Sequence, residues 1–313
     1  MSRRILSYTA DEIFYECSEG THCESKPYLQ IGDKEPSLLS RLPRNTNHRA
    51  LYQYWQSMVE RYSGRQLTVH SDKLPAIAGV ATKIRDATKS SYLAGLWQDN
   101  LTSYLLWQRS MLEQHDVGLT QYRTPTFSWA SIETTIECSE GWGSSLRVGI
   151  TIIEAACMAT DLNPLGEVTD GFIVLEGVLV EGTLNTEQTA ERKYSLEFPQ
   201  LMPIAGKDKV ESRFLPDLLL VEDSMATETG AQQRIVRRAR PGDTIASIID
   251  APIKLLVVKR SEEPWLSVIE GIVLRPSLRV TGAFDRLGYF SLYRGKKDRP
   301  FWRSWDRSRT HLV

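Results

Sequence analysis

Asp161-Leu-Asn-Pro-Leu-Gly166 separates two runs rich in β-branched residues, and this stretch decides the fold. The flanking runs are Ser145-Leu-Arg-Val-Gly-Ile-Thr-Ile-Ile-Glu-Ala-Ala-Cys-Met-Ala159 and Phe172-Ile-Val-Leu-Glu-Gly-Val-Leu-Val-Glu-Gly-Thr-Leu184. Asn, Pro and Gly so close together favour a tight turn, so the two runs are predicted to form a β-hairpin. Strands joined by turns instead of helices indicate an antiparallel sheet.

The rest of the second half repeats this alternation of strands and turns. Ser261-Glu-Glu-Pro264 predicts a second hairpin, because turn residues there separate two apolar runs. Residues 234–247 fit either a helix or an irregular insert, since Pro241 and Gly242 disfavour a long helix. Further strands are expected at residues 4–8, 13–17, 132–138, 191–198, 213–222, 253–260, 265–275 and 286–293.

Between residues 45 and 107 the apolar period becomes helical. Asn45 or Thr46 is a suitable N-cap for a first helix, and Gly64 is a suitable stop. A second helix is predicted from Ser71, with Pro75 in its first turn, and a short third helix over 101–107. The inward face of the first helix is expected to carry Leu51, Tyr54, Trp55, Met58, Val59 and Tyr62. That of the second is expected to carry Leu74, Ile77, Ala78, Ala81 and Ile84.

Together these patterns predict an α+β fold, with an N-terminal helical layer packed on a large, mainly antiparallel β-sheet or open barrel. Residues 1–130 are expected to form an extended start plus the helical layer. Residues 131–295 are expected to form the β-rich region packed on it, so that both make one compact unit. Residues 296–313 read as a basic tail.

The tail admits two interpretations. Its cations stand beside Trp302 and Trp305, a mixture that suits single-stranded nucleic acid or a membrane surface. Asp298 and Asp306 reduce the net positive charge of the tail, and terminal segments are commonly solvated. We favour this second interpretation, a solvated tail without a binding role.

Composition fits an ordinary globular protein. Of the 313 residues 41% are hydrophobic and 25% are charged, and the formal net charge is −1. Such a balance supplies no field that would attract nucleic acid or anionic lipid. No run of about 20 uncharged apolar residues occurs, so no membrane span is expected. Four cysteines in a chain of this length fit reduced thiols, and we expect a cytoplasmic protein.

No cofactor motif is present in the sequence. Gly141-Trp-Gly143 lacks the third glycine and the strand–helix setting of a dinucleotide loop, and no P-loop pattern occurs. Cys17, His22 and Cys23 lack the second ligand pair of a structural zinc site. We therefore expect neither a cofactor nor a metal.

Four titratable residues are candidates for acid–base chemistry. His70 precedes the second predicted helix and Asp86 lies near its end. Arg109 and Glu133 flank the region of the chain that contains Trp129. A carboxylate or imidazole desolvated in a pocket can be shifted towards the pKa that catalysis requires. A structural or solvated role is the more common one for such isolated residues.

Three tryptophans, Trp97, Trp107 and Trp129, fall within a short stretch of the chain. They could line a pocket for a small apolar or aromatic ligand, because aromatic walls offer large apolar area with a few polar groups. They could equally form the packed seam between the helical layer and the sheet, which we favour.

The order of several segments resembles the region downstream of the HET module in fungal heterokaryon-incompatibility proteins. Each segment alone is short, and the likeness rests on their order and spacing between about residue 10 and residue 293. The segments are Ile13–Cys17, Cys23–Ser25, Tyr62-Ser63, Ser71–Ala81, Tyr92–Trp97, Leu105–Trp107, Thr126–Ser131, Gly166–Val168, Gly171–Gly177, Gly271–Arg275 and Arg286–Phe290.

The resemblance implies recognition or regulation between proteins, without a catalytic assignment that can be transferred. In the family the HET module, with a Ser-Tyr-x-Trp-Gly-like segment, lies upstream, and no equivalent of that segment is found here. We therefore expect a stand-alone or truncated family protein acting without catalysis on a protein partner. The alternative is an enzyme of fungal secondary metabolism that uses the same scaffold for a cyclisation or acid–base step.

Overall fold

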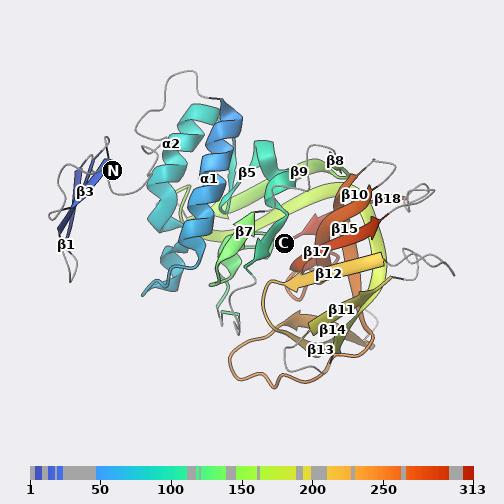
Figure 1. Cartoon of the computed structure of the whole chain (residues 1–313). Coiled ribbons are helices and arrows are strands. Elements are labelled where there is room, and N and C mark those ends of the chain that lie inside the picture. The colour runs from blue at the N-terminus through green and yellow to red at the C-terminus, as the bar shows by residue number, and fades with distance from the viewer. Residues whose placement is uncertain are drawn as a thin grey trace.

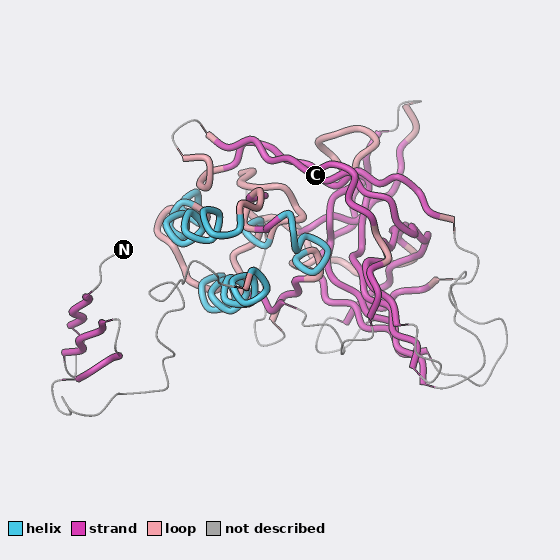
Figure 2. Tube along the Cα trace, turned by 90° about the horizontal axis from the view of Figure 1, so that it is seen from above, coloured by secondary structure: helices cyan, strands magenta, loops and turns pink. Residues whose placement is uncertain are grey.

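The computed structural model describes residues 4–8, 13–17, 20–23, 47–110, 118–119, 121–138, 146–160, 163–187, 193–198, 210–226, 230–261, 266–295 and 306–313. It has the predicted mixed α+β class, in which strands greatly outnumber helices and a nine-stranded sheet dominates (Figure 1). Viewed from above, the helices gather on one side and the strands of that sheet on the other (Figure 2).

The first helix, α1 (His48–Ser63), agrees with the apolar period. Its N-cap is Asn47, whose side chain accepts a hydrogen bond from the Arg49 N–H at 2.9 Å. The proposed caps Asn45 and Thr46 lie outside the described residues. Gly64 is the C-cap, as predicted. The apolar face of α1 includes Trp55, which is fully buried.

The second predicted helix begins as two 3-10 turns. These are η2 (His70–Lys73) and η3 (Pro75–Ile77), and only then does α2 (Ala78–Thr88) follow. Pro75 stands at the start of η3, where its missing N–H removes no helical bond. The five residues predicted to face inward are all buried, which confirms the face of this element.

The described residues between 92 and 138 form short elements beside α1. Trp55 Nε1 donates to the Gly95 carbonyl at 2.9 Å, and the Trp129 indole donates to the same oxygen at 3.1 Å. α1 packs against α2 and against the last strand of this stretch. The elements are β4 (Tyr92–Leu93), β5 (Leu96–Trp97), η4 (Gln98–Asn100), α3 (Leu101–Tyr104), β6 (Trp107–Arg109), η5 (Trp129–Ser131) and β7 (Ile136–Cys138).

Both predicted hairpins are confirmed in the large sheet. The strands on either side of residues 161–166, β9 and β10, pair antiparallel, and so do the strands on either side of residues 261–264, β15 and β16. The strands of the second half are β8 (Leu146–Val148), β9 (Thr151–Ala159), β10 (Val168–Glu187), β11 (Lys193–Glu197), β12 (Val210–Pro216), β13 (Leu220–Ala226), β14 (Gln232–Arg238), β15 (Ala251–Ser261), β16 (Leu266–Pro276), β17 (Phe284–Gly295) and β18 (Arg307–Leu312).

Strand pairing runs round in a ring. It passes from β10 through β15, β16, β17 and β18 back to β10, and each of these pairs is antiparallel except β17–β18. Two apolar cores result. One consists mainly of strand side chains such as Leu255 and Val273, and the other joins α1, α2 and residues 92–136 to strand residues such as Ile173 and Leu256.

Several segments differ from the sequence-based expectation. The helix expected over 101–107 ends at Tyr104, and the strand expected over 213–222 is divided between β12 and β13. Residues 234–238 of the stretch 234–247 belong to β14, paired with β13, because Ile235 and Val236 are buried there. The last residues of the expected basic tail form β18, which pairs with β10 through Leu312 and its neighbours. At the start of the chain, the two strands predicted from sequence, β1 (Arg4–Tyr8) and β2 (Ile13–Cys17), are confirmed and pair antiparallel, and β3 (Gly20–Cys23) adds a third strand.

Candidate functional site

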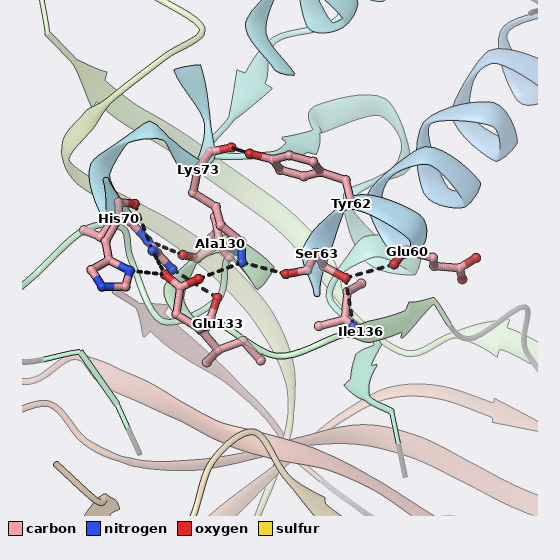
Figure 3. Close-up of polar contacts among 11 residues, drawn as sticks. Glu60, Tyr62, Ser63, His70, Lys73, Ala130, Glu133 and Ile136 are labelled. Carbon is pink, nitrogen blue, oxygen red and sulfur yellow. Dashed lines mark hydrogen bonds and ion pairs between the residues drawn. The ribbon is translucent and has the colours of Figure 1, made fainter. Parts of the chain in front are cut away.

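Four charged or titratable side chains meet between the end of α1 and η5, and Figure 3 labels three of them, His70, Lys73 and Glu133. His70 and Lys73 belong to η2. Arg123 lies in the loop before η5, and Glu133 lies just after η5. Glu133 is the common partner of the other three. We call these four residues the Glu133 cluster.

The end of α1 holds η2 and Lys73 in place. The Tyr62 hydroxyl donates to the Lys73 carbonyl at 2.8 Å, and Lys73 Nζ donates to the Ser63 carbonyl at 2.6 Å. Ser63 Oγ in turn donates to the Glu60 carbonyl and accepts from the Ile136 N–H at 2.9 Å. The Lys73 side chain is 0% exposed, so its charge must be balanced by nearby oxygen atoms.

Arg123 ties three backbone segments together. Its Nε donates to the Ala130 carbonyl at 2.6 Å and Nη2 donates to the Ile132 carbonyl at 3.0 Å. Its Nη1 donates to the His70 carbonyl at 3.0 Å and also contacts Glu133 Oε1. The guanidinium therefore fixes the position of η2 relative to η5.

Glu133 is held in its charged form. Burial alone would raise the pKa of this carboxyl, but the hydrogen bond and charge of Arg123, together with Lys73, outweigh it and lower the pKa below its usual value. Lys73 Nζ lies 3.1 Å from Glu133 Oε2. A general acid or base that works near neutral pH needs a pKa shifted in the opposite direction.

His70 is the member of this cluster that faces solvent. Its side chain is 65% exposed, and Nδ1 lies 3.3 Å from Glu133 Oε1. A carboxylate at Nδ1 can hold the imidazole ring with a proton on that nitrogen, which leaves Nε2 as a proton acceptor towards solvent. Of the contacts in the cluster, the pair of His70 and Glu133 is the one best suited to acid–base chemistry.

The other two titratable candidates do not join His70 and Glu133. Asp86 is exposed on α2, where its ion pair is with the neighbouring Arg85 at 3.5 Å. Arg109 lies on β6, opposite Ile136 of β7, and its buried Nη1 has no hydrogen-bond partner among the described residues. The structure thus brings two of the four candidates into contact.

The three tryptophans of the suggested ligand pocket are all buried. Trp97 packs edge-on against Trp55, with ring centroids 5.6 Å apart. Trp107 Nε1 donates to the Phe127 carbonyl at 2.8 Å, and Trp129 packs edge-on against Tyr62 at 6.2 Å. Their faces are therefore covered mainly by protein atoms.

A second polar centre, which the sequence did not indicate, lies against the ring of Trp107. Asp217 and Arg286 have fully buried side chains joined by two hydrogen bonds, Nε to Oδ2 at 2.9 Å and Nη2 to Oδ1 at 3.0 Å. The Arg286 guanidinium also donates to the carbonyls of Leu105 and Trp107 and lies 3.6 Å from the centroid of the Trp107 ring. Arg238 donates from β14 to the same Asp217 carboxylate. This centre fastens the sheet to residues 105–107.

Comparison with family models, with curated proteins and with solved structures gave no match. The interpretation of the site therefore rests on its geometry and on the sequence resemblance.

Elsewhere the described part of the chain has an open groove of about 400 Å³. It is lined by Glu181, Gly182, Thr183, Gln233, Pro252, Ile253 and Lys254, and it contains none of the predicted site residues. Among the described residues, no group of three or more His, Cys, Asp or Glu side chains gathers closely enough to hold a metal ion. No described helix combines the length and apolar character needed to cross a membrane.

Proposed function

We propose that this chain is a protein of the heterokaryon-incompatibility family that acts in recognition or regulation between proteins, without catalysis. The observation that carries the proposal is the state of Glu133. Its carboxylate balances the buried Lys73 and the nearly buried Arg123, and its pKa is lowered. It therefore performs a structural task that a catalytic proton exchange would disrupt.

The segments behind the family resemblance also have structural tasks. The β4–β5 turn at Gly95 accepts the indole hydrogen bonds of Trp55 and Trp129, and Ser128 Oγ donates to the Ala94 carbonyl at 2.5 Å. Such segments specify a scaffold, and a scaffold of this kind suits binding to a partner. In this proposal the protein works in the cytoplasm, and α1, α2 and the tryptophan segments form the layer that covers the sheet.

Co-expression tests the proposal directly. The chain is produced in a fungal host together with a full-length protein of the same family, and the cell death that the HET module causes is scored. We expect the chain to raise or suppress that response. A matched control is a chain carrying Asp217→Asn, which leaves the surface unchanged but weakens the fold. A response identical with and without the chain contradicts the proposal.

The alternative is an enzyme acting on a small apolar or aromatic molecule, and one observation favours it. His70 is exposed, and Glu133 lies at its Nδ1, as a general base requires. A panel of aromatic polyketide-like ligands, followed by tryptophan fluorescence and thermal unfolding, distinguishes the two. A saturable response that disappears in His70→Ala supports the enzyme, whereas we expect no saturable response in either protein.

A further inference from the structure

The strand β9 forms an edge of the large sheet. It pairs with β10 through its residues from Thr151 to Ala159, and no hydrogen bond joins its other side to another described strand. Not one of its nine residues is buried, in contrast with β15, in which most residues are. The outward backbone N–H and C=O groups along about 30 Å of this edge are thus available for pairing.

This edge carries a bulge at Ile153, where the register with β10 shifts, but it lacks the other features by which monomeric proteins protect such strands. Lysine, proline and inward-pointing charges usually block pairing with another chain. The sequence of β9, Thr-Ile-Ile-Glu-Ala-Ala-Cys-Met-Ala, contains no lysine or proline and a single charge at Glu154. Ile153 and Met158 are 45% and 57% exposed, which is high for apolar side chains. The edge is therefore suited to association.

The charges along the edge match a second copy of the same strand. In β18, Arg307 Nη2 donates to Thr151 Oγ1 at 2.7 Å and to the Glu176 carbonyl at 3.0 Å, so its cation lies beside Thr151. Glu154 lies opposite Val174 and Thr151 lies opposite Glu176 on β10. Val174 and Glu176 are two residues apart, so Glu154 and Thr151 project from the same face of the sheet.

We propose that two copies of this chain associate by antiparallel pairing of β9 with β9, about a two-fold axis perpendicular to the sheet. Such an axis places residue i of one strand opposite residue j of the other and repeats the same contact in reverse. A register that sets Glu154 opposite Thr151 of the second copy pairs residues 151–154 of the two β9 strands and brings Glu154 next to Arg307 of that copy. Two ion pairs then form, one on each side of the axis. This inference goes beyond the proposed function and does not depend on it.

Sedimentation of the full chain over a range of concentrations tests the association. We expect a monomer–dimer equilibrium, which weakens as salt is added, since the two ion pairs lie at an exposed edge. Ile153→Lys places a cation within the paired residues and is expected to weaken the dimer at least about tenfold. Ile249→Lys is the matched control, because Ile249 is also exposed, at 64%, but lies outside the sheet. A monomer at all concentrations, or a dimer equally sensitive to both changes, overturns the proposal.

Exchange of the two charges tests the register. Glu154→Arg and Arg307→Glu are each expected to weaken the dimer, and the double variant is expected to recover most of the loss. Thermal unfolding of each variant at low concentration shows whether the monomer remains folded. Failure of the double variant to recover, with folded monomers, overturns the register. Protection of the β9 amides from hydrogen exchange should rise with protein concentration, and protection that rises only with an added peptide indicates a different occupant and overturns the dimer.

Discussion

Neutralising Asp217 should destabilise the protein far more than neutralising an exposed carboxylate with the same hydrogen bonds. Asp217→Asn keeps the shape of the side chain but leaves the fully buried Arg286 guanidinium without its counter-ion. Removing one partner of a buried ion pair costs about 3–5 kcal/mol. Arg286 would keep two backbone carbonyls and the Trp107 ring, so we expect a loss of about 3 kcal/mol, near the lower end of that range.

Urea denaturation followed by circular dichroism measures this loss. For a chain of this size an unfolding slope near 3 kcal/mol per molar urea converts the loss into a midpoint lower by about 1 M. Glu222→Gln is the matched control, because Arg234 binds Glu222 through the same two-bond geometry, at 2.6 and 2.9 Å, on the exposed surface of the β13–β14 hairpin.

We expect the control to shift the midpoint hardly at all, since exposed ion pairs contribute little. The double variant Asp217→Asn with Arg286→Met should be more stable than Asp217→Asn alone, because it removes the uncompensated charge. Equal losses for the buried and exposed carboxylates would refute the argument that burial sets the magnitude.

Three further predictions follow from the described contacts. Glu133→Gln should destabilise the protein at pH 7 and less at low pH: the pKa of Glu133 lies below its usual value, so its contribution is present above about pH 4.3 and is lost as the pH falls through the lowered pKa. Urea midpoints measured between pH 2.5 and pH 7 check this, and parallel curves for both proteins would contradict it. Cys157 should resist alkylation in the native protein, because desolvation of its half-buried thiol raises the pKa of that group to about 12; site-resolved mass spectrometry with iodoacetamide, before and after unfolding, tests it. Gly95→Ala should cost more stability than Gly282→Ala: both glycines have a positive φ, 96° and 77°, but a Cβ at Gly95 would lie 2.6 Å from Trp129 Nε1 whereas Gly282 has open space. The shared backbone cost is about 1–2 kcal/mol, and similar unfolding midpoints for the two variants would show that the indole yields freely.

Local patterns predicted those elements whose stability depends on near neighbours. α1 was found from its helical period and its Gly64 stop, and the β9–β10 hairpin from the turn residues at 161–166. In both cases the residues that determine the element lie within a few positions of one another. The same holds for the inward face of η3 and α2, where Ile77, Ala81 and Ile84 are buried.

Two strands were not predicted, for different reasons. β14 pairs with the preceding strand β13, but the sequence offered there only Ile235 and Val236 between glutamines and arginines, too short an apolar pattern to indicate a strand. β18 contains three cations or potential cations and is placed by pairing with β10, about 130 residues earlier in the chain. The apolar period of a segment does not indicate which distant strand that segment pairs with, because the period depends on the segment alone.

The candidate site was predicted in part for the same reason. His70 and Glu133 were chosen for their chemistry, and the fold brings them into contact. Lys73 and Arg123 were not predicted, although the position of Lys73 in the sequence gave one indication of its role. It stands four residues before Ile77 and eight before Ala81, at a position of the apolar face, where a buried cation requires a nearby anion.

The charges of the Glu133 cluster also limit any chemistry this site could perform. A carboxylate that balances two cations shielded from solvent must remain ionised, whereas a general acid must exchange its proton during the reaction. Glu133 therefore serves only to orient and stabilise, and any proton transfer would fall to Nε2 of the exposed His70. His70→Ala removes that nitrogen without touching the contact of Glu133 with Lys73 or Arg123. A loss of function with unchanged stability in this variant would assign chemistry or recognition to the imidazole itself. Unchanged function would leave the cluster as a structural tie between η2 and η5, which is the outcome we expect.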